Sequence, residues 1–287
     1  MVIAAMHKVG WVRRALALGT IGLAAVVGVL AGGSVLAGPA GAGGPQGYWT
    51  VTREGKVDAF GAAHFYGSAP GSLFGPQTVG LAATADAAGY WLSFSNGTID
   101  SFGDAVFYGK PVVTGGAKVA GLAPTPDGHG YWVALSTGKV DAFGDAGFYG
   151  SLPAGSGKVV GLAPTPDGHG YWLATSTGSV AAFGDAVFYG ADAKPPKPIV
   201  AIAATRDGAG YWLVQSNGSI VAFGDAVFYG AANSLGLTIT GIMVTPDGAG
   251  YWLVASDGKV IAYGDAIYLG SGSSSALFDP TVGGTPN

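Results

Sequence analysis

The chain has 287 residues, of which 49% are hydrophobic, 10% are charged and 53 are glycine, and its formal net charge is −4. Few charges combined with much glycine and many aromatic residues are typical of an all-β repeat protein and exclude a disordered chain. The chain has no cysteine, which excludes disulfides, thiol nucleophiles and thiolate metal sites.

The first 40 residues have the pattern of an export signal. Three basic residues precede an uncharged stretch at residues 15–36, and small residues follow it. This pattern predicts a signal peptide over residues 1–37 and a Gly/Pro-rich linker over residues 38–46. The alternative is an uncleaved anchor through residues 15–36, because an apolar run of about 20 residues can span a bilayer. We therefore expect a secreted, extracellular protein or one anchored to the outer face of the cytoplasmic membrane.

Cleavage after residue 37 leaves ten basic residues against seventeen acidic ones, a net charge of −7. An acidic surface repels phosphate backbones, so we expect no nucleic-acid partner. Membrane contact is expected only through the N-terminal segment, if it is not cleaved, and the protein is expected to be a monomer.

From residue 47 the chain is built from one repeat, which the dipeptide Tyr-Trp marks six times. The steps between markers are 42, 41, 40, 40 and 40 residues. A fixed period in this range indicates a solenoid, a propeller or an array.

A single repeat contains four predicted strands, which the copy at residues 159–190 shows clearly. The runs at 159–165, 171–176, 179–183 and 187–190 are rich in β-forming residues and are separated by the turns PDGHG, TG and GDA. Asp-Gly supplies the positive φ angles of a tight hairpin. Four strands in 40 residues, joined by hairpins, predict one blade of a β-propeller.

The two ends of the repeat region predict how the ring is joined. The first copy begins at Gly47 with no strand before it, whereas residues 277–285 follow the last copy and are similar to residues 73–80, which lead into the second copy. Pairing this C-terminal strand with the first copy leaves no open sheet edge. We therefore expect an all-β fold over residues 47–287, a six-bladed β-propeller with four strands per blade, closed by the C-terminal strand completing the first blade.

The repeat pattern PDGxGYWLxxSxGxVxxFGDAxFYG resembles the propeller-type repeats of many secreted actinobacterial proteins, most of them of unassigned function. It covers residues 47–270. The Thr-Pro-Asp-Gly turn is similar to the hairpin of TolB-like propeller repeats. Thr125-x-Asp127 followed by Trp132 resembles the Asp-box of sialidase-type propellers, with the glycine displaced by one position.

Positions shared by the copies are interpreted as blade structure. The turn aspartates are expected to accept hydrogen bonds from local backbone N–H groups, as in Asx turns, on one face of the propeller. A ring of carboxylates binding Ca²⁺ is the alternative, although no DxDxDG loop is present. The turn residues are Asp104, Asp127, Asp145, Asp167, Asp185, Asp207, Asp225, Asp247 and Asp265. The tryptophans are expected to wedge between blades, and they are Trp49, Trp91, Trp132, Trp172, Trp212 and Trp252.

The connectors between copies diverge most, and loops on a rigid scaffold commonly carry binding. The face that they form, together with the Arg53-Glu54-Gly55 turn, is therefore the predicted interaction surface. Its connector lysines would form a basic rim suited to anionic polymers or acidic partners, with simple solubility as the alternative. They are Lys110, Lys118, Lys158, Lys194 and Lys197.

Histidines offer no clear site in the sequence. His64 lies in the first copy, which departs most from the pattern, and drift in the joining blade is the simpler interpretation. His129 and His169 occupy the same turn position in adjacent copies. Two histidines can share a metal, but the sequence shows no third ligand, so neither a metal nor a cofactor is expected.

The residue inventory gives little support for catalysis. Glu54 is the only glutamate, Arg53 and Arg206 are the only arginines after residue 37, and no G-x-S-x-G motif occurs. A retaining glycosidase needs a distinguished pair of carboxylates, which repeated aspartates do not offer. We expect a non-catalytic binding or scaffold module at the cell envelope, with a protein or cell-wall glycan partner. The alternatives are a hydrolase or lyase of esterase or glycosidase type on the variable face, and a multivalent lectin.

Overall fold

The structure is a computed structural model that describes residues 46–71, 74–272 and 278–287. The predicted signal segment, the anchor alternative and all but the last residue of the predicted linker lie outside these residues. The described chain forms eighteen β-strands, arranged in six antiparallel sheets of three strands each. The prediction of an all-β fold is confirmed. Within the described ranges, no helix is both long and apolar enough to cross a membrane.

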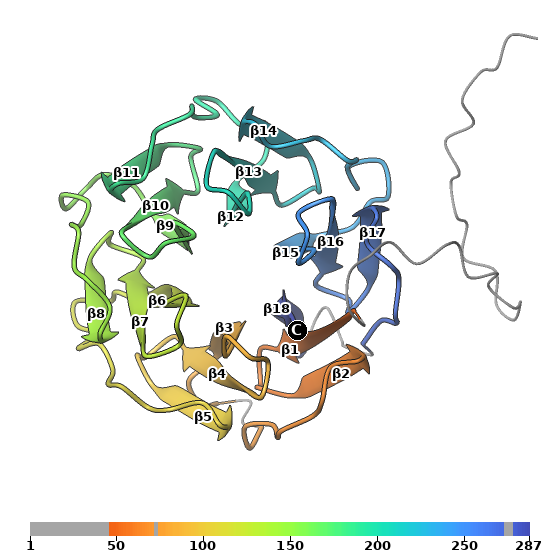
Figure 1. Ribbon diagram of the computed structural model, residues 1–287, viewed down its shortest axis with the longest axis horizontal. Coiled ribbons are helices and arrows are strands. Elements are labelled where there is room, and N and C mark those ends of the chain that lie inside the picture. The colour runs from red at the N-terminus through yellow and green to blue at the C-terminus, as the bar shows by residue number, and fades with distance from the viewer. Residues whose placement is uncertain (1–45, 72–73, 273–277) are drawn as a thin grey trace, which may run out of the picture. The chain divides into compact units, whose positions relative to one another are not determined.

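The six sheets stand around a common axis as the blades of a propeller (Figure 1). Each blade has an inner, a middle and an outer strand. The inner strands are β18 (Thr281–Pro286), β3 (Thr78–Ala83), β6 (Val119–Pro124), β9 (Val159–Pro164), β12 (Ile199–Ala204) and β15 (Ile239–Val244). The middle strands are β1 (Gly47–Thr52), β4 (Gly89–Phe94), β7 (Gly130–Leu135), β10 (Gly170–Thr175), β13 (Gly210–Gln215) and β16 (Gly250–Ala255). The outer strands are β2 (Val57–Gly61), β5 (Ile99–Gly103), β8 (Val140–Gly144), β11 (Val180–Gly184), β14 (Ile220–Gly224) and β17 (Val260–Gly264).

Blades are numbered here from 1 (β18-β1-β2) to 6 (β15-β16-β17). Blade 1 contains both ends of the repeat region, because β18 pairs antiparallel with β1. Tyr48 lies opposite Pro286 and Thr52 opposite Thr281, with a register shift beside Thr52. The predicted C-terminal strand therefore completes the first blade. Leu277, the first residue of the predicted run, lies outside the described residues.

The predicted fourth strand is absent, which corrects the expected blade of four strands. The segment that follows each outer strand is irregular in the described chain. In blade 4 the backbone of this segment is bound by Tyr211, which belongs to blade 5. The Tyr211 hydroxyl accepts from the N–H groups of Tyr189 (3.2 Å) and Gly190 (3.0 Å). It also donates to the Gly190 carbonyl (2.6 Å). A side chain of the next blade thus uses the backbone groups that a fourth strand would pair. Phe188, which was predicted to lie in that strand, is 56% exposed.

Every junction between consecutive blades has this tyrosine bond. The segment that follows an outer strand is here called the outer segment. The middle-strand tyrosine of each blade donates to a glycine carbonyl in the outer segment of the preceding blade, at 2.5–2.6 Å. Where the last blade meets the first, the Tyr48 hydroxyl donates to the Gly270 carbonyl at 2.6 Å. The junction between the last blade and the first, where the bonded tyrosine and glycine lie 222 residues apart, therefore has the same bond as the other five.

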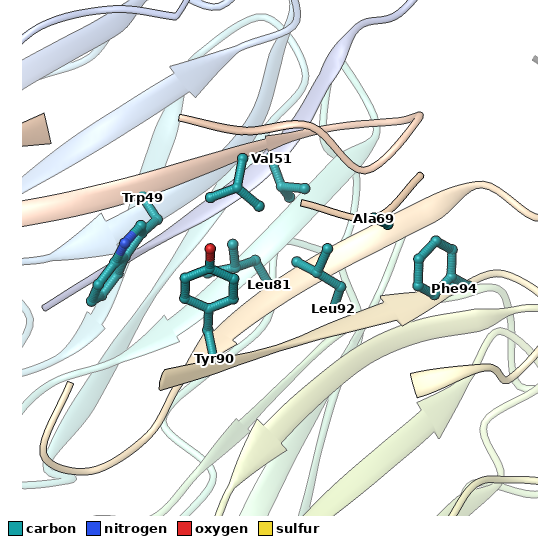
Figure 2. Packing of buried hydrophobic residues seen from close by; sticks show 8 residues of the cluster. Trp49, Val51, Ala69, Leu81, Tyr90, Leu92 and Phe94 are labelled. Carbon is teal, nitrogen blue, oxygen red and sulfur yellow. The ribbon is translucent and has the colours of Figure 1, made fainter. Parts of the chain in front are cut away.

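The hydrophobic core lies between blades. All six middle strands are buried along their whole length, because each sheet is covered by neighbours on both faces. Figure 2 shows one such interface, where Trp49 and Val51 of blade 1 face Tyr90 and Leu92 of blade 2. Burial of these large apolar side chains is the main force that holds adjacent blades together.

Each repeat tryptophan connects its own blade with the next one. The six rings are at most 1% exposed, and the Trp172 ring centroid lies 5.7 Å from that of Tyr211 in the next blade. The Trp172 indole N–H donates to the Val187 carbonyl at 2.7 Å. The same bond to the residue fifteen positions later occurs in every blade. A buried indole therefore has its polar atom satisfied, as such rings require.

Candidate functional site

The turns between inner and middle strands and the turns after the outer strands meet at one end of the ring, here called the turn face. In blade 3, the Thr125 hydroxyl lies 2.7 Å from an oxygen of Asp127 and 3.3 Å from one of Asp145. The Asp127 carboxylate also accepts from the His129 backbone N–H at 3.2 Å, as expected for an Asx turn. The structure thus brings together two aspartates that are eighteen positions apart.

Carboxylate pairs of this kind occur in blades 2 to 6. They are Asp86/Asp104, Asp127/Asp145, Asp167/Asp185, Asp207/Asp225 and Asp247/Asp265. In blades 5 and 6 the two members of a pair are electrostatically distinct, because the pKa is lowered for Asp207 and Asp247 and raised for Asp225 and Asp265. The N–H of His169 and the Thr165 hydroxyl lower the pKa of Asp167 to about 2. In blade 5, partial burial and the nearby Asp207 carboxylate raise the pKa of Asp225.

A cavity of about 470 Å³ opens on the turn face between blades 5 and 6. Its polar lining includes Arg206, Asp207, Asp225 and Asp247. Arg206 forms no ion pair or hydrogen bond within the described chain. The cavity therefore offers a free guanidinium beside three carboxyl groups.

The cavity lies where the repeat departs from its own pattern. The turns of blades 3 and 4 have proline at the position of Arg206. At the junction of blades 4 and 5, that proline packs closely on the next turn: a Cβ built on Gly208 would lie 2.8 Å from Pro166 Cδ. At the next junction, a Cβ built on Gly248 would meet only Arg206 Cβ, at 3.6 Å. Arginine in place of the proline ring therefore leaves space between the two turns.

Arg206 is not among the site residues predicted from the sequence. The turns vary little between copies, which indicates blade structure, and the divergent connectors favour the opposite face as the binding surface. The signal was nevertheless present, because the turn at 205–208 reads Thr-Arg-Asp-Gly where three other copies read Thr-Pro-Asp-Gly. Its meaning depends on how one turn packs on the next, which a single repeat does not reveal.

A smaller cavity of about 200 Å³ lies on the opposite face between blades 1 and 2, and Glu54 and Asp100 are among its lining residues. Neighbouring contacts tie the Arg53-Glu54 turn to the C-terminal segment. The Arg53 guanidinium donates to the Phe278 carbonyl at 2.6 Å, and the Glu54 N–H donates to Asp279 Oδ1 at 2.8 Å. Arg53 therefore stabilises the contact between the β1–β2 turn and the C-terminal segment in blade 1. The Glu54 side chain instead lines the cavity.

The connector lysines are all exposed, and they lie on three different connectors. No ion pair involves them within the described residues. The structure places Lys110 and Lys118 after blade 2, Lys158 after blade 3, and Lys194 and Lys197 after blade 4. They are spread along one arc of the ring and do not line either cavity described above.

The three histidines in the described part of the chain divide into two kinds. His64 packs edge-on against Tyr66, with ring centroids 4.9 Å apart, in the outer segment of blade 1. His129 and His169 each lie beside the carboxylate pair of their own blade. Asp145 and Asp185 are the third potential metal ligands of these two groups, and the sequence did not reveal them.

No family model matches the chain, and no curated protein matches it in sequence. Among solved structures, it is similar to the β-propeller domain of Cps50 (Swd1) from Myceliophteria thermophila. The similarity covers 76% of this chain and 82% of that one, with 12% sequence identity and a TM-score of 0.51. At this identity the likeness establishes the β-propeller fold and carries no functional information.

Proposed function

We propose that the protein is a non-catalytic binding module that is exported and acts at the cell envelope, with a cell-wall glycan or an envelope protein as its partner. The observation that carries this proposal is the cavity between blades 5 and 6, where Arg206 stands in place of the proline of blades 3, 4 and 6. A concave site with a few convergent polar groups on a rigid scaffold is the usual form of a ligand site.

The chemistry of the cavity favours a ligand with several polar groups. Arg206 can donate to an anionic or hydroxyl group of the ligand, while Asp207, Asp225 and Asp247 can accept from hydroxyl or amino groups. Val227, which is 52% exposed, adds apolar surface to the lining. This combination suits a sugar or a short peptide.

Binding is favoured over catalysis because the carboxylate pair of blade 5 is not unique to that blade. The same Asp-Asp pair occurs in five blades, and pairs in direct contact are too close for the separations of about 5–9.5 Å used by glycosidases. The hydrolase or lyase alternative concerns the variable face that the connectors form. Its test is activity on esterase, glycosidase and polysaccharide-lyase substrates.

The exchange Arg206→Pro is the sharpest test of the binding proposal. It restores the residue that blades 3, 4 and 6 carry at this position, so the variant should fold while the cavity fills. We expect ligands identified on a glycan array, or among purified cell-wall fragments, to lose at least tenfold in affinity. Unchanged affinity in the Arg206→Pro variant would remove the cavity from the proposal.

A matched variant tests the same idea in the opposite direction. Pro166→Arg should open an equivalent space beside Gly208, between blades 4 and 5, and create a second site for the same ligand.

The alternative binding surface is the face that carries the connectors between copies, here called the connector face. Its control is a variant in which the charges of Lys194 and Lys197 are reversed. If the lysine exchanges abolish binding and Arg206→Pro does not, the working surface is the connector face.

A further inference from the structure

Blades 3 and 4 each contain an imidazole beside their carboxylate pair. His129 stands with Asp127 and Asp145, and in each blade one potential ligand atom from each of the three residues lies within 4.8 Å of the others. The second group is Asp167, His169 and Asp185. The remaining blades that have this turn carry alanine at the histidine position, namely Ala88, Ala209 and Ala249.

The imidazole is already directed at the carboxylates. His129 Nδ1 lies 3.3 Å from Asp127 Oδ2, and His169 Nδ1 lies 3.3 Å from Asp167 Oδ2. The Asp127 carboxylate is fixed from the other side by the Thr125 hydroxyl and by the His129 backbone N–H. A ligand set whose members are already oriented loses little conformational entropy when an ion binds.

From this geometry we propose that the protein has two sites for a divalent transition-metal ion of the Zn²⁺ type, one at Asp127/His129/Asp145 and one at Asp167/His169/Asp185. One nitrogen and two carboxylate oxygens match the ligands that Zn²⁺ accepts. Ca²⁺ and Mg²⁺ prefer sites made of oxygen alone, so the histidine sets the preference. Three protein ligands leave at least one coordination position for water or for a donor atom of a bound partner.

The histidines are dispensable for the fold of the turn, which makes them clean positions for mutation. The backbone N–H of Ala209 donates to Asp207 at 3.1 Å and that of Ala249 to Asp247 at 3.2 Å, as His129 does to Asp127 at 3.2 Å. The turn thus has the same geometry with alanine. His129→Ala and His169→Ala should fold and melt like the parent protein.

The test is titration of the full chain, free of any affinity tag, with Zn²⁺ alone in a calorimeter. The parent should bind two ions, each single variant one, and the double variant none at the same concentrations. Ala249→His should add a third site at Asp247 and Asp265. Equal binding by the parent and by the double variant would overturn the proposal, and so would failure of the parent to saturate at two ions. These results do not depend on Arg206, so the two proposals can fail separately.

Discussion

The hydroxyl of Tyr48 offers a direct measure of how firmly the last blade holds the first. It donates to the Gly270 carbonyl at 2.6 Å and accepts from the Leu269 N–H at 3.2 Å. Tyr48→Phe removes both bonds and retains the ring, which packs 5.3 Å from Phe60 and 5.3 Å from Trp252 between centroids. At about 1 kcal/mol net for each hydrogen bond lost, the free energy of unfolding should fall by roughly 2 kcal/mol.

The control is Tyr211→Phe, which removes the corresponding bonds at a junction where the bonded residues lie only 21 or 22 positions apart in the sequence. Tyr211 makes three such bonds against the two of Tyr48, so by the same reasoning Tyr211→Phe should lose about 3 kcal/mol in urea denaturation. For a domain of this size a loss of 2 kcal/mol corresponds to roughly 4–8 °C in Tm. A stable Tyr48→Phe beside a destabilised Tyr211→Phe would refute the reasoning. It would mean that in solution the last blade does not hold the first, and that the ring is open there.

Three further predictions concern the core, the joint in blade 1 and alkaline stability. Trp172→Ala should lower the free energy of unfolding by about 3–5 kcal/mol. Trp172→Phe should lower it less, because only the hydrogen bond to the Val187 carbonyl and part of the ring are lost. Denaturant midpoints of the two variants measure both effects. Removing residues 278–287 takes away β18 and exposes the edge of β1, so the shortened chain should self-associate in sedimentation experiments and be rescued by the missing peptide added in trans. Burial raises the pKa of Tyr48 to about 12, so the folded state holds this proton more tightly than the unfolded chain does. The contribution of Tyr48 to the free energy of unfolding should therefore be fully present below pH 10 and decline between pH 10 and 12. The decline should coincide with tyrosine ionisation, which absorbance at 295 nm measures.

Much of the fold could be predicted because it is encoded locally and repeated. The spacing of the Tyr-Trp markers gave the number of blades, and the Asp-Gly turns located the strands of the repeat to within about two residues of β9, β10 and β11. The unmatched strand at the C-terminus indicated its pairing with β1. These features depend on turn chemistry and on residue periodicity, which a sequence displays directly.

The outer segment of each blade could not be predicted in the same way. The run Val187–Gly190 is as rich in β-forming residues as the strands are, and its propensity alone favours a strand. The Tyr211 hydroxyl, from the next blade, captures its backbone groups instead. Tertiary packing therefore overrides local propensity at this position.

The sequence by itself determined the repeat, the strand order, the turn residues and the inventory of charged groups. Only the tertiary structure decided which of those groups meet: Asp127 with Asp145 and His129, and Arg206 with the turn of the following blade. The physical reason is that a turn is specified by its own few residues, whereas a cavity or a ligand set depends on side chains from turns that are distant in sequence. The turns of one ligand set meet when the strands of a single blade pair, and the turns that line the cavity meet when neighbouring blades pack against one another.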